Sequence, residues 1–110
     1  MPIRITERQV CKKIIERKGD FLAEHRARGK KTMRYDPESF RTDMLSRDFI
    51  ASQPTISCKW RMLQAGGVVK PDNGGYCIDI ATLYLRAGEP VPPLCSANDG
   101  YTIIDGGEER

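Results

Sequence analysis

The sequence predicts a small α+β domain: three helices, then a two-stranded β-hairpin, then an extended C-terminal tail. Apolar residues recur at helical spacing in three segments between residues 6 and 66. Two short apolar runs then flank the turn-forming sequence "PDNGG". The last segment is rich in Pro, Gly and acidic residues, a composition that disfavours a packed core. In a chain of 110 residues we therefore expect one domain over residues 1–88 and an acidic arm over residues 89–110.

The first helix is expected to begin at Thr6, because Thr6 and Gln9 have the spacing of a capping box. Its apolar side chains predict a buried face of Val10, Ile14, Phe21 and Leu22, with Cys11 and Ile15 at the edge. Gly29 ends the helical pattern, and the following "RGKKTMRY" is interpreted as a basic loop.

The second helix is expected to begin at "DPESF", where Asp36 can cap and Pro37 suits the first helical position. Its predicted buried face is Phe40, Met44, Leu45 and Phe49. The third helix spans residues 52–66, with Ser52 as its cap, Pro54 in its first turn, and Gly66 or Gly67 at its end.

The hairpin is predicted from "VVK" and "YCIDI", because Asn73-Gly74 between them is a strong two-residue turn signal. The next segment, "ATLYLRAG", is compatible with a short closing helix or with a continuation of the sheet. In the tail, the one apolar piece is "YTII", residues 101–104, which could add a strand to this subunit or to another.

The stretch "LSRDFIASQPTISCKWRMLQAGGVV", residues 45–69, resembles a pattern common in the winged helix-turn-helix superfamily, L-A-x-x-L-G-V-S-x-x-x-V-x-x-x-L-x-x-L-x-x-x-G-L-I. In this match, Leu45 and Phe49 belong to the second helix. The core positions of the third helix are Ile56, Trp60 and Leu63. The turn into the first wing strand is formed by Gly67, Val68 and Val69. Trp60 is thereby interpreted as a core residue. The resemblance extends over residues 45–80.

One position departs from that pattern. Ile50 stands where the family usually has a turn glycine, and a β-branched residue resists the positive φ of such a turn. Either the turn is longer in this chain, or the second helix continues to Ala51.

The resemblance implies that the third helix enters the major groove of double-stranded DNA. The candidate contacts on that helix are Gln53, Thr55, Ser57, Lys59, Arg61 and Gln64. Arg61 can make a bidentate contact with guanine and Gln53 with adenine, whereas Ser57 and Lys59 suit phosphates. The wing lacks an Arg or Lys at its turn, and Asp72 there would repel phosphate.

Charge along the chain is uneven. Residues 1–35 carry a net charge of +7 and residues 71–110 a net charge of −5, within a total of +3. The candidate phosphate contacts in the basic part are Lys12, Lys13, Lys30, Lys31 and Arg34.

Other classes of function have little support. The sequence lacks a phosphate-binding loop and a zinc-protease motif, and its single histidine, His25, disfavours histidine-based catalysis. The cysteines, at positions 11, 58, 77 and 95, have no paired spacing, so we interpret them as reduced and expect no metal or cofactor. We also expect a cytoplasmic protein without a membrane segment.

The sequence thus predicts a small transcriptional regulator that binds double-stranded DNA, with a homodimer through the first helix or "YTII" as a candidate assembly. The alternative is a winged-helix adaptor that binds another protein. A DNA-binding protein needs one continuous positive surface that includes Lys59, Arg61 and part of the first helix, whereas an adaptor would have scattered basic residues and an exposed apolar patch around Cys58 and Met62.

Overall fold

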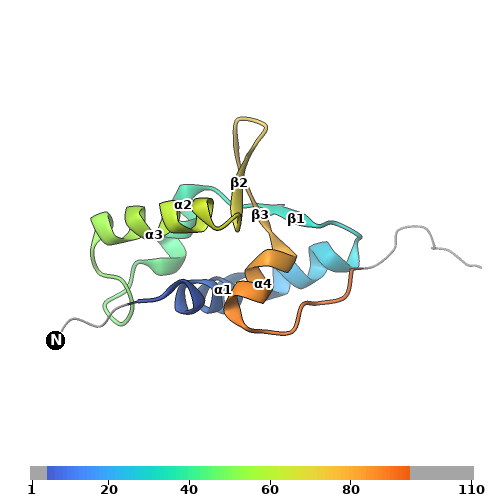
Figure 1. Cartoon of the computed structure of the whole chain (residues 1–110), viewed down its shortest axis with the longest axis horizontal. Coiled ribbons are helices and arrows are strands. Elements are labelled where there is room, and N and C mark those ends of the chain that lie inside the picture. Colours follow the sequence, from blue (N-terminus) through green and yellow to red (C-terminus); the bar gives the residue numbers. More distant parts are fainter. Residues whose placement is uncertain (1–4, 95–110) are drawn as a thin grey trace, which may run out of the picture.

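The computed structural model describes residues 5–94 (Figure 1). These residues form four helices and a three-stranded antiparallel sheet, so the α+β class is confirmed. In chain order the elements are α1 (Glu7–Ala27), β1 (Thr32–Arg34), α2 (Pro37–Met44), α3 (Gln53–Ala65), β2 (Val69–Asp72), β3 (Gly75–Asp79) and α4 (Ile80–Ala87).

The sheet has the order β1-β3-β2, with β3 paired to both neighbours. The hairpin of β2 and β3 stands out from the helices, whereas α4 returns from β3 to pack along α1 (Figure 1). In the same view α3 lies on the hairpin side of α1. One face of the molecule is therefore formed by α1 and α4, and the opposite one by α3 and the hairpin.

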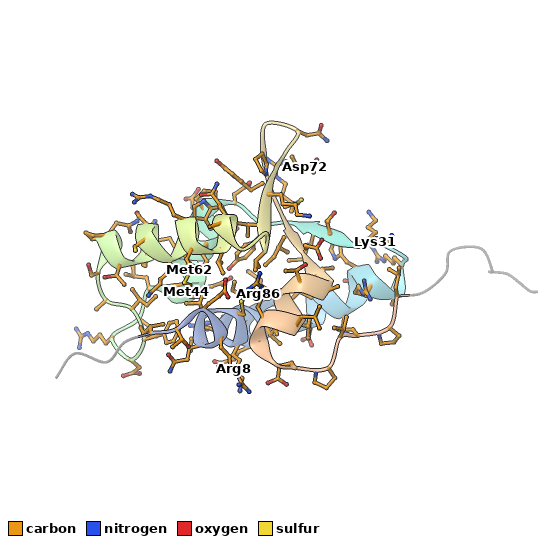
Figure 2. All side chains as sticks on the ribbon, in the orientation of Figure 1. Arg8, Lys31, Met44, Met62, Asp72 and Arg86 are labelled. Carbon is orange, nitrogen blue, oxygen red and sulfur yellow. The ribbon has the colours of Figure 1, made fainter. Side chains whose placement is uncertain are left out.

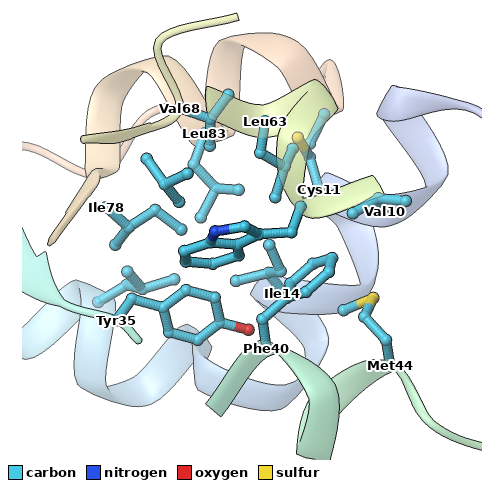
Figure 3. Packing of buried hydrophobic residues seen from close by; sticks show 14 of the residues in the cluster. Val10, Cys11, Ile14, Tyr35, Phe40, Met44, Leu63, Val68, Ile78 and Leu83 are labelled. Carbon is cyan, nitrogen blue, oxygen red and sulfur yellow. The ribbon is translucent and has the colours of Figure 1, made fainter. Parts of the chain in front are cut away.

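An aromatic cluster around Trp60 joins α3 to α2 and β3. Trp60 is only 8 % exposed, and its ring centroid lies 5.3 Å from those of Phe40 and Tyr76. Figure 3 shows how Tyr35 and Phe40 meet apolar side chains of α1, α3, β3 and α4 in this core. Because Trp60, Ile56 and Leu63 are all buried, the predicted core stripe of the third helix is confirmed.

Several boundary predictions are also confirmed. The Thr6 hydroxyl accepts from the Gln9 N–H, and the Gln9 side chain accepts from the Thr6 N–H, which completes the capping box. Asn73 and Gly74 both adopt positive φ, as a tight hairpin turn requires. For "ATLYLRAG", which the sequence left open between helix and sheet, the structure has a helix with Asp79 as its N-cap and Gly88 ending it at a φ of 74°.

The numbers of helices and strands were both predicted one too low. The segment interpreted as a basic loop contains β1, because Met33 pairs with Ile78 and the sheet thereby gains a third strand. A strand of three residues is too short to show the alternating pattern that reveals strands in a sequence. The fourth helix is α4, which the sequence left open as helix or strand.

The predicted buried face of α1 was wrong at Phe21. Phe21 is 55 % exposed, whereas Cys11, expected at the edge, is fully buried. Leu22 takes the core position one residue later, and a rotation of about 100° per residue then turns Phe21 outward.

The connection between α2 and α3 settles the question raised by Ile50. The helix ends at Met44, and residues 45–52 form a longer turn in which the Ser46 N–H donates to the Ile50 carbonyl at 2.9 Å. The assignment of Leu45 and Phe49 to the second helix was therefore wrong, and Leu45 is 43 % exposed. Ile50 instead buries its side chain, without the positive φ that a turn glycine would adopt.

Asp36 and Ser52 stand at the predicted N-cap positions, but their side chains accept no capping hydrogen bond. The Asp36 carboxylate instead accepts from the Tyr76 N–H at 3.2 Å and so ties the start of α2 to β3. The predicted "YTII" segment, residues 101–104, lies outside the described residues.

Candidate nucleic-acid interface

The predicted contact residues of α3 lie on two different flanks of the helix. With about 100° of rotation per residue, the buried stripe of Ile56, Trp60 and Leu63 separates one flank from the other. The flank nearer the hairpin, here called the hairpin flank, comprises Gln53, Ser57, Arg61 and Gln64. Thr55, Lys59 and Met62 form the other flank, and Figure 2 shows Met62 on the side of α3 that faces α1.

The hairpin flank borders a hollow of about 330 Å³. Its far walls come from Pro37 at the start of α2 and from Tyr76 on β3. Trp60, Phe40 and Ile56 lie at its floor, where the Trp60 and Tyr76 rings meet edge to face at 85°. The hollow therefore has an aromatic floor and a rim made mainly of polar side chains from α3.

The polar groups of this flank are free to contact a ligand. Within residues 5–94, the side chains of Gln53, Ser57, Arg61 and Gln64 make no hydrogen bond or ion pair to another residue. Arg61 is exposed and Ser57 is half-buried. Free amide, hydroxyl and guanidinium groups on one helix flank suit contacts with base edges and phosphates.

Lys59 and Thr55 are separated from this group. Both are half-buried, and they sit on the flank turned toward α1. At the end of that flank, the Arg86 guanidinium donates to the Gly66 carbonyl and pairs with Glu7, so α1, α3 and α4 meet there (Figure 2). The structure thus does not bring Lys59 together with Arg61 in one surface on α3.

Lys12 and Lys13 lie on α1, away from the hairpin flank. The Lys12 ammonium pairs with Glu89, just after α4, at 3.7 Å. The Lys13 ammonium pairs with Glu16 at 3.3 Å and lies 5.4 Å from the centroid of the Phe49 ring. The structure therefore does not join either lysine to the α3 group.

The basic residues around β1 divide by position. Arg34 ends β1 beside β3, where its guanidinium pairs with Asp36 at 3.3 Å and fills the space that a Cβ on Gly75 would need. Arg34 therefore lies near Tyr76 and the wall of the hollow. Lys30 and Lys31 are exposed at the other end of β1, and Figure 2 shows Lys31 far from α3.

The tip of the hairpin carries little positive charge. Asp72 lies close to the tip in Figure 2, and the Lys70 ammonium is engaged by Asp79 at 3.6 Å. Burial alone would raise the pKa of Asp79, but the hydrogen bonds from Thr82 and the charge of Lys70 outweigh burial and lower it. The hairpin therefore has little positive charge available for contacts with a negatively charged ligand.

The sequence missed three residues that complete the hollow: Pro37, Phe40 and Tyr76. Phe40 was predicted to be buried and Tyr76 to lie on a strand, yet neither was linked to α3. Their proximity depends on the contact between Asp36 and β3, which joins residues 40 positions apart and has no local signal in the sequence.

The cysteines offer no cluster in the described part of the chain. Cys11, Cys58 and Cys77 are free thiols, and burial raises the pKa of Cys11 to about 12. Between residues 5 and 94, no three His, Cys, Asp or Glu side chains gather where a metal ion could bind. His25 is half-buried, with its Nδ1 atom 2.8 Å from the Phe21 carbonyl.

No protein-family model, curated protein or solved structure matches this chain. Of the helices in residues 5–94, none combines the length and the apolar character needed to cross a membrane.

Proposed function

We propose that this protein is a winged-helix domain that binds double-stranded DNA through the hairpin flank of α3 and acts as a small transcriptional regulator. The observation that carries the proposal is the group of polar side chains on that flank, including the charged Arg61, that have no partner within residues 5–94.

The order of the elements supports the winged-helix part of the proposal. The next elements after α3 are β2 and β3, which form a hairpin with a two-residue turn. This hairpin projects on the side of the molecule where α3 lies (Figure 1). A duplex whose major groove receives α3 would therefore also meet the hairpin. The turn of residues 45–52 is longer than the three or four residues of a typical helix-turn-helix, which changes how α2 approaches the duplex.

The chemistry of the flank supports contact with DNA. The guanidinium of Arg61 fits the O6 and N7 acceptors of guanine, and the amides of Gln53 and Gln64 fit adenine. Arg34 lies on β1 near Tyr76, but its guanidinium is paired with Asp36, so a phosphate contact would have to share it with that carboxylate. Lys12, Lys13 and Lys59 have no part in this interface, and Lys30 and Lys31 reach DNA only if the duplex extends along β1.

The observations bearing on the adaptor alternative are divided. The basic residues are scattered and form no continuous surface of Lys59, Arg61 and α1, as an adaptor would have. An adaptor also requires an apolar patch around Cys58 and Met62, but Met62 packs against the core. The large apolar side chains that are exposed within residues 5–94, Phe21, Leu45, Leu85 and Leu94, belong to other elements. We keep a homodimer in the proposal only because regulators of this kind commonly bind two DNA half-sites as dimers.

Fluorescence anisotropy with a labelled random-sequence duplex tests the proposal. We expect wild-type binding to weaken as salt rises, and Arg61→Ala to weaken it about tenfold at fixed salt, because a charge-assisted contact is lost. Lys12→Ala removes the same charge from the opposite face and is the matched control, with binding expected within about twofold of wild type. Lys59→Ala is expected to behave like the control.

Equal losses in Arg61→Ala and Lys12→Ala would show that binding follows net charge and not this flank. The absence of binding even at low salt would overturn the proposal and direct attention to protein partners of α3.

A further inference from the structure

The hollow beside α3 contains a distinctive combination of groups. Its floor is aromatic, its rim carries the amides of Gln53 and Gln64 and the hydroxyl of Ser57, and Arg61 is its one charged lining residue. No carboxylate lines it. Its volume of about 330 Å³ is at the lower end of the range for small-molecule sites.

Trp60 supplies a second observation. Its side chain is 8 % exposed and lines the hollow, yet its indole N–H donates no hydrogen bond to any residue between 5 and 94. A buried indole N–H usually has an acceptor. Trp60 thus has an indole donor without a partner among residues 5–94, and the rim of the hollow carries further donors that these residues leave unused.

We propose that this hollow binds a small aromatic carboxylate. The ring of such a ligand covers the exposed edges of Trp60 and Tyr76, and its carboxylate pairs with the Arg61 guanidinium. The neutral amides on the rim donate to the remaining oxygen lone pairs.

The charge balance favours a carboxylate over a phosphate. A carboxylate carries one negative charge and its planar shape matches the fork of a single guanidinium. A phosphate monoester carries nearly two charges at neutral pH, and sites for it usually gather more than one cation or a set of backbone N–H groups. Arg34, on the neighbouring strand β1, does not line the hollow and is already paired with Asp36.

Occupation of the hollow would have a regulatory consequence, which rests on the proposed function. The ligand uses Gln53, Ser57, Arg61 and Gln64, the same side chains that we propose to contact DNA. An aromatic carboxylate would therefore compete with DNA for α3. Binding of the ligand itself does not depend on whether the protein binds DNA.

The experiment uses the fluorescence of Trp60, which is the only tryptophan in the chain and lines the hollow. The full-length protein is titrated without DNA, using benzoate, neutral benzamide, acetate and thymidine monophosphate. We expect a saturable change with benzoate and a dissociation constant of about 1 mM or below. Benzamide lacks the charge and acetate lacks the ring, so each should bind at least about tenfold more weakly.

The variant Arg61→Gln should weaken benzoate binding by at least about tenfold, because it removes the charge from an exposed position without disturbing the core. Arg47→Gln removes the same charge from an exposed residue outside the hollow and is expected to bind benzoate as wild type does. No saturable response to benzoate, an equal response to benzamide, or an unchanged Arg61→Gln would overturn the proposal. Tighter binding of thymidine monophosphate than of benzoate would overturn it in favour of a nucleotide site. Because DNA is absent, these outcomes are independent of the test of DNA binding.

Discussion

At the scale of single residues, the buried contact between Tyr35 and Asp43 fixes the position of α2. Asp43 is 4 % exposed, and its carboxylate accepts from the Tyr35 hydroxyl at 2.6 Å and faces the Lys18 ammonium at 3.7 Å. Burial and the neighbouring carboxylate both raise the pKa of Tyr35, so its hydroxyl remains a donor at neutral pH. Lys18 of α1, Asp43 of α2 and Tyr35, the residue after β1, thus meet in one polar cluster beside the apolar core.

Replacement of Tyr35 by Phe tests this contact. The change keeps the aromatic ring but removes the hydroxyl that donates to Asp43. Because the buried Asp43 carboxylate then loses this donor, the free energy of unfolding should fall by about 1–3 kcal/mol. Tyr84→Phe is the matched control, since Tyr84 is also buried but its hydroxyl has no hydrogen-bond partner in residues 5–94. Urea unfolding of both variants measures the difference, and equal stabilities would contradict a structural role for the Tyr35 hydroxyl.

At the scale of elements, Asp79 joins the hairpin to α4. Its carboxylate accepts from the Thr82 N–H at 3.1 Å and pairs with Lys70 on the neighbouring strand. Asp79→Ala removes the cap and should cost about 1 kcal/mol at neutral pH, whereas Asp79→Asn keeps a capping oxygen and should cost a few tenths. Thermal or urea unfolding measures both differences.

The cap also predicts a dependence on pH. Since the pKa of Asp79 is lowered in the folded state, its charge stabilises the fold above the unfolded pKa of about 3.9, and this contribution is lost as the pH falls through the lowered value. The stability difference between wild type and Asp79→Asn should therefore shrink below about pH 4. A difference that grows on acidification would show that the charge of Asp79 opposes folding.

Elements with a local signal could be predicted from the sequence, and those that depend on distant partners could not. The capping box at Thr6, the stripe through Trp60 and the turn at Asn73 are each specified within a few residues, and all three are confirmed. β1 was missed because it exists only through its pairing with β3. The end of α2 at Met44 was missed because the family pattern placed Leu45 and Phe49 on a helix that this chain ends earlier.

The same distinction applies to the candidate site. Gln53, Ser57, Arg61 and Gln64 were predicted from the family resemblance in one set with Thr55 and Lys59, although a rotation of about 100° per residue places those two on the other flank. Lys12 and Lys13 could not be placed, since their position depends on how α1 packs against α4. The hollow itself arises from three elements and was not predictable from any one of them.

At the scale of the whole molecule, the two faces differ in how their polar side chains are paired. Ion pairs such as Lys12–Glu89 and Arg86–Glu7 lie on α1 and α4, whereas the polar side chains of the hairpin flank of α3 have no side-chain partner within residues 5–94. The positive charge of the N-terminal third is thus not concentrated where α3 would meet DNA. Because the basic residues of α1 lie away from α3, the proposed function depends on where DNA binds and not on the net charge of the protein.

The most direct test is an NMR titration of the isotope-labelled full-length protein with a short duplex, which follows the backbone amide signals. We expect the largest shifts at Gln53, Ser57, Arg61 and Gln64 and in the hairpin, with little change at Lys12 and Lys13. Shifts centred on α1, or no shifts at a duplex concentration well above that of the protein, would contradict the proposed DNA-binding face.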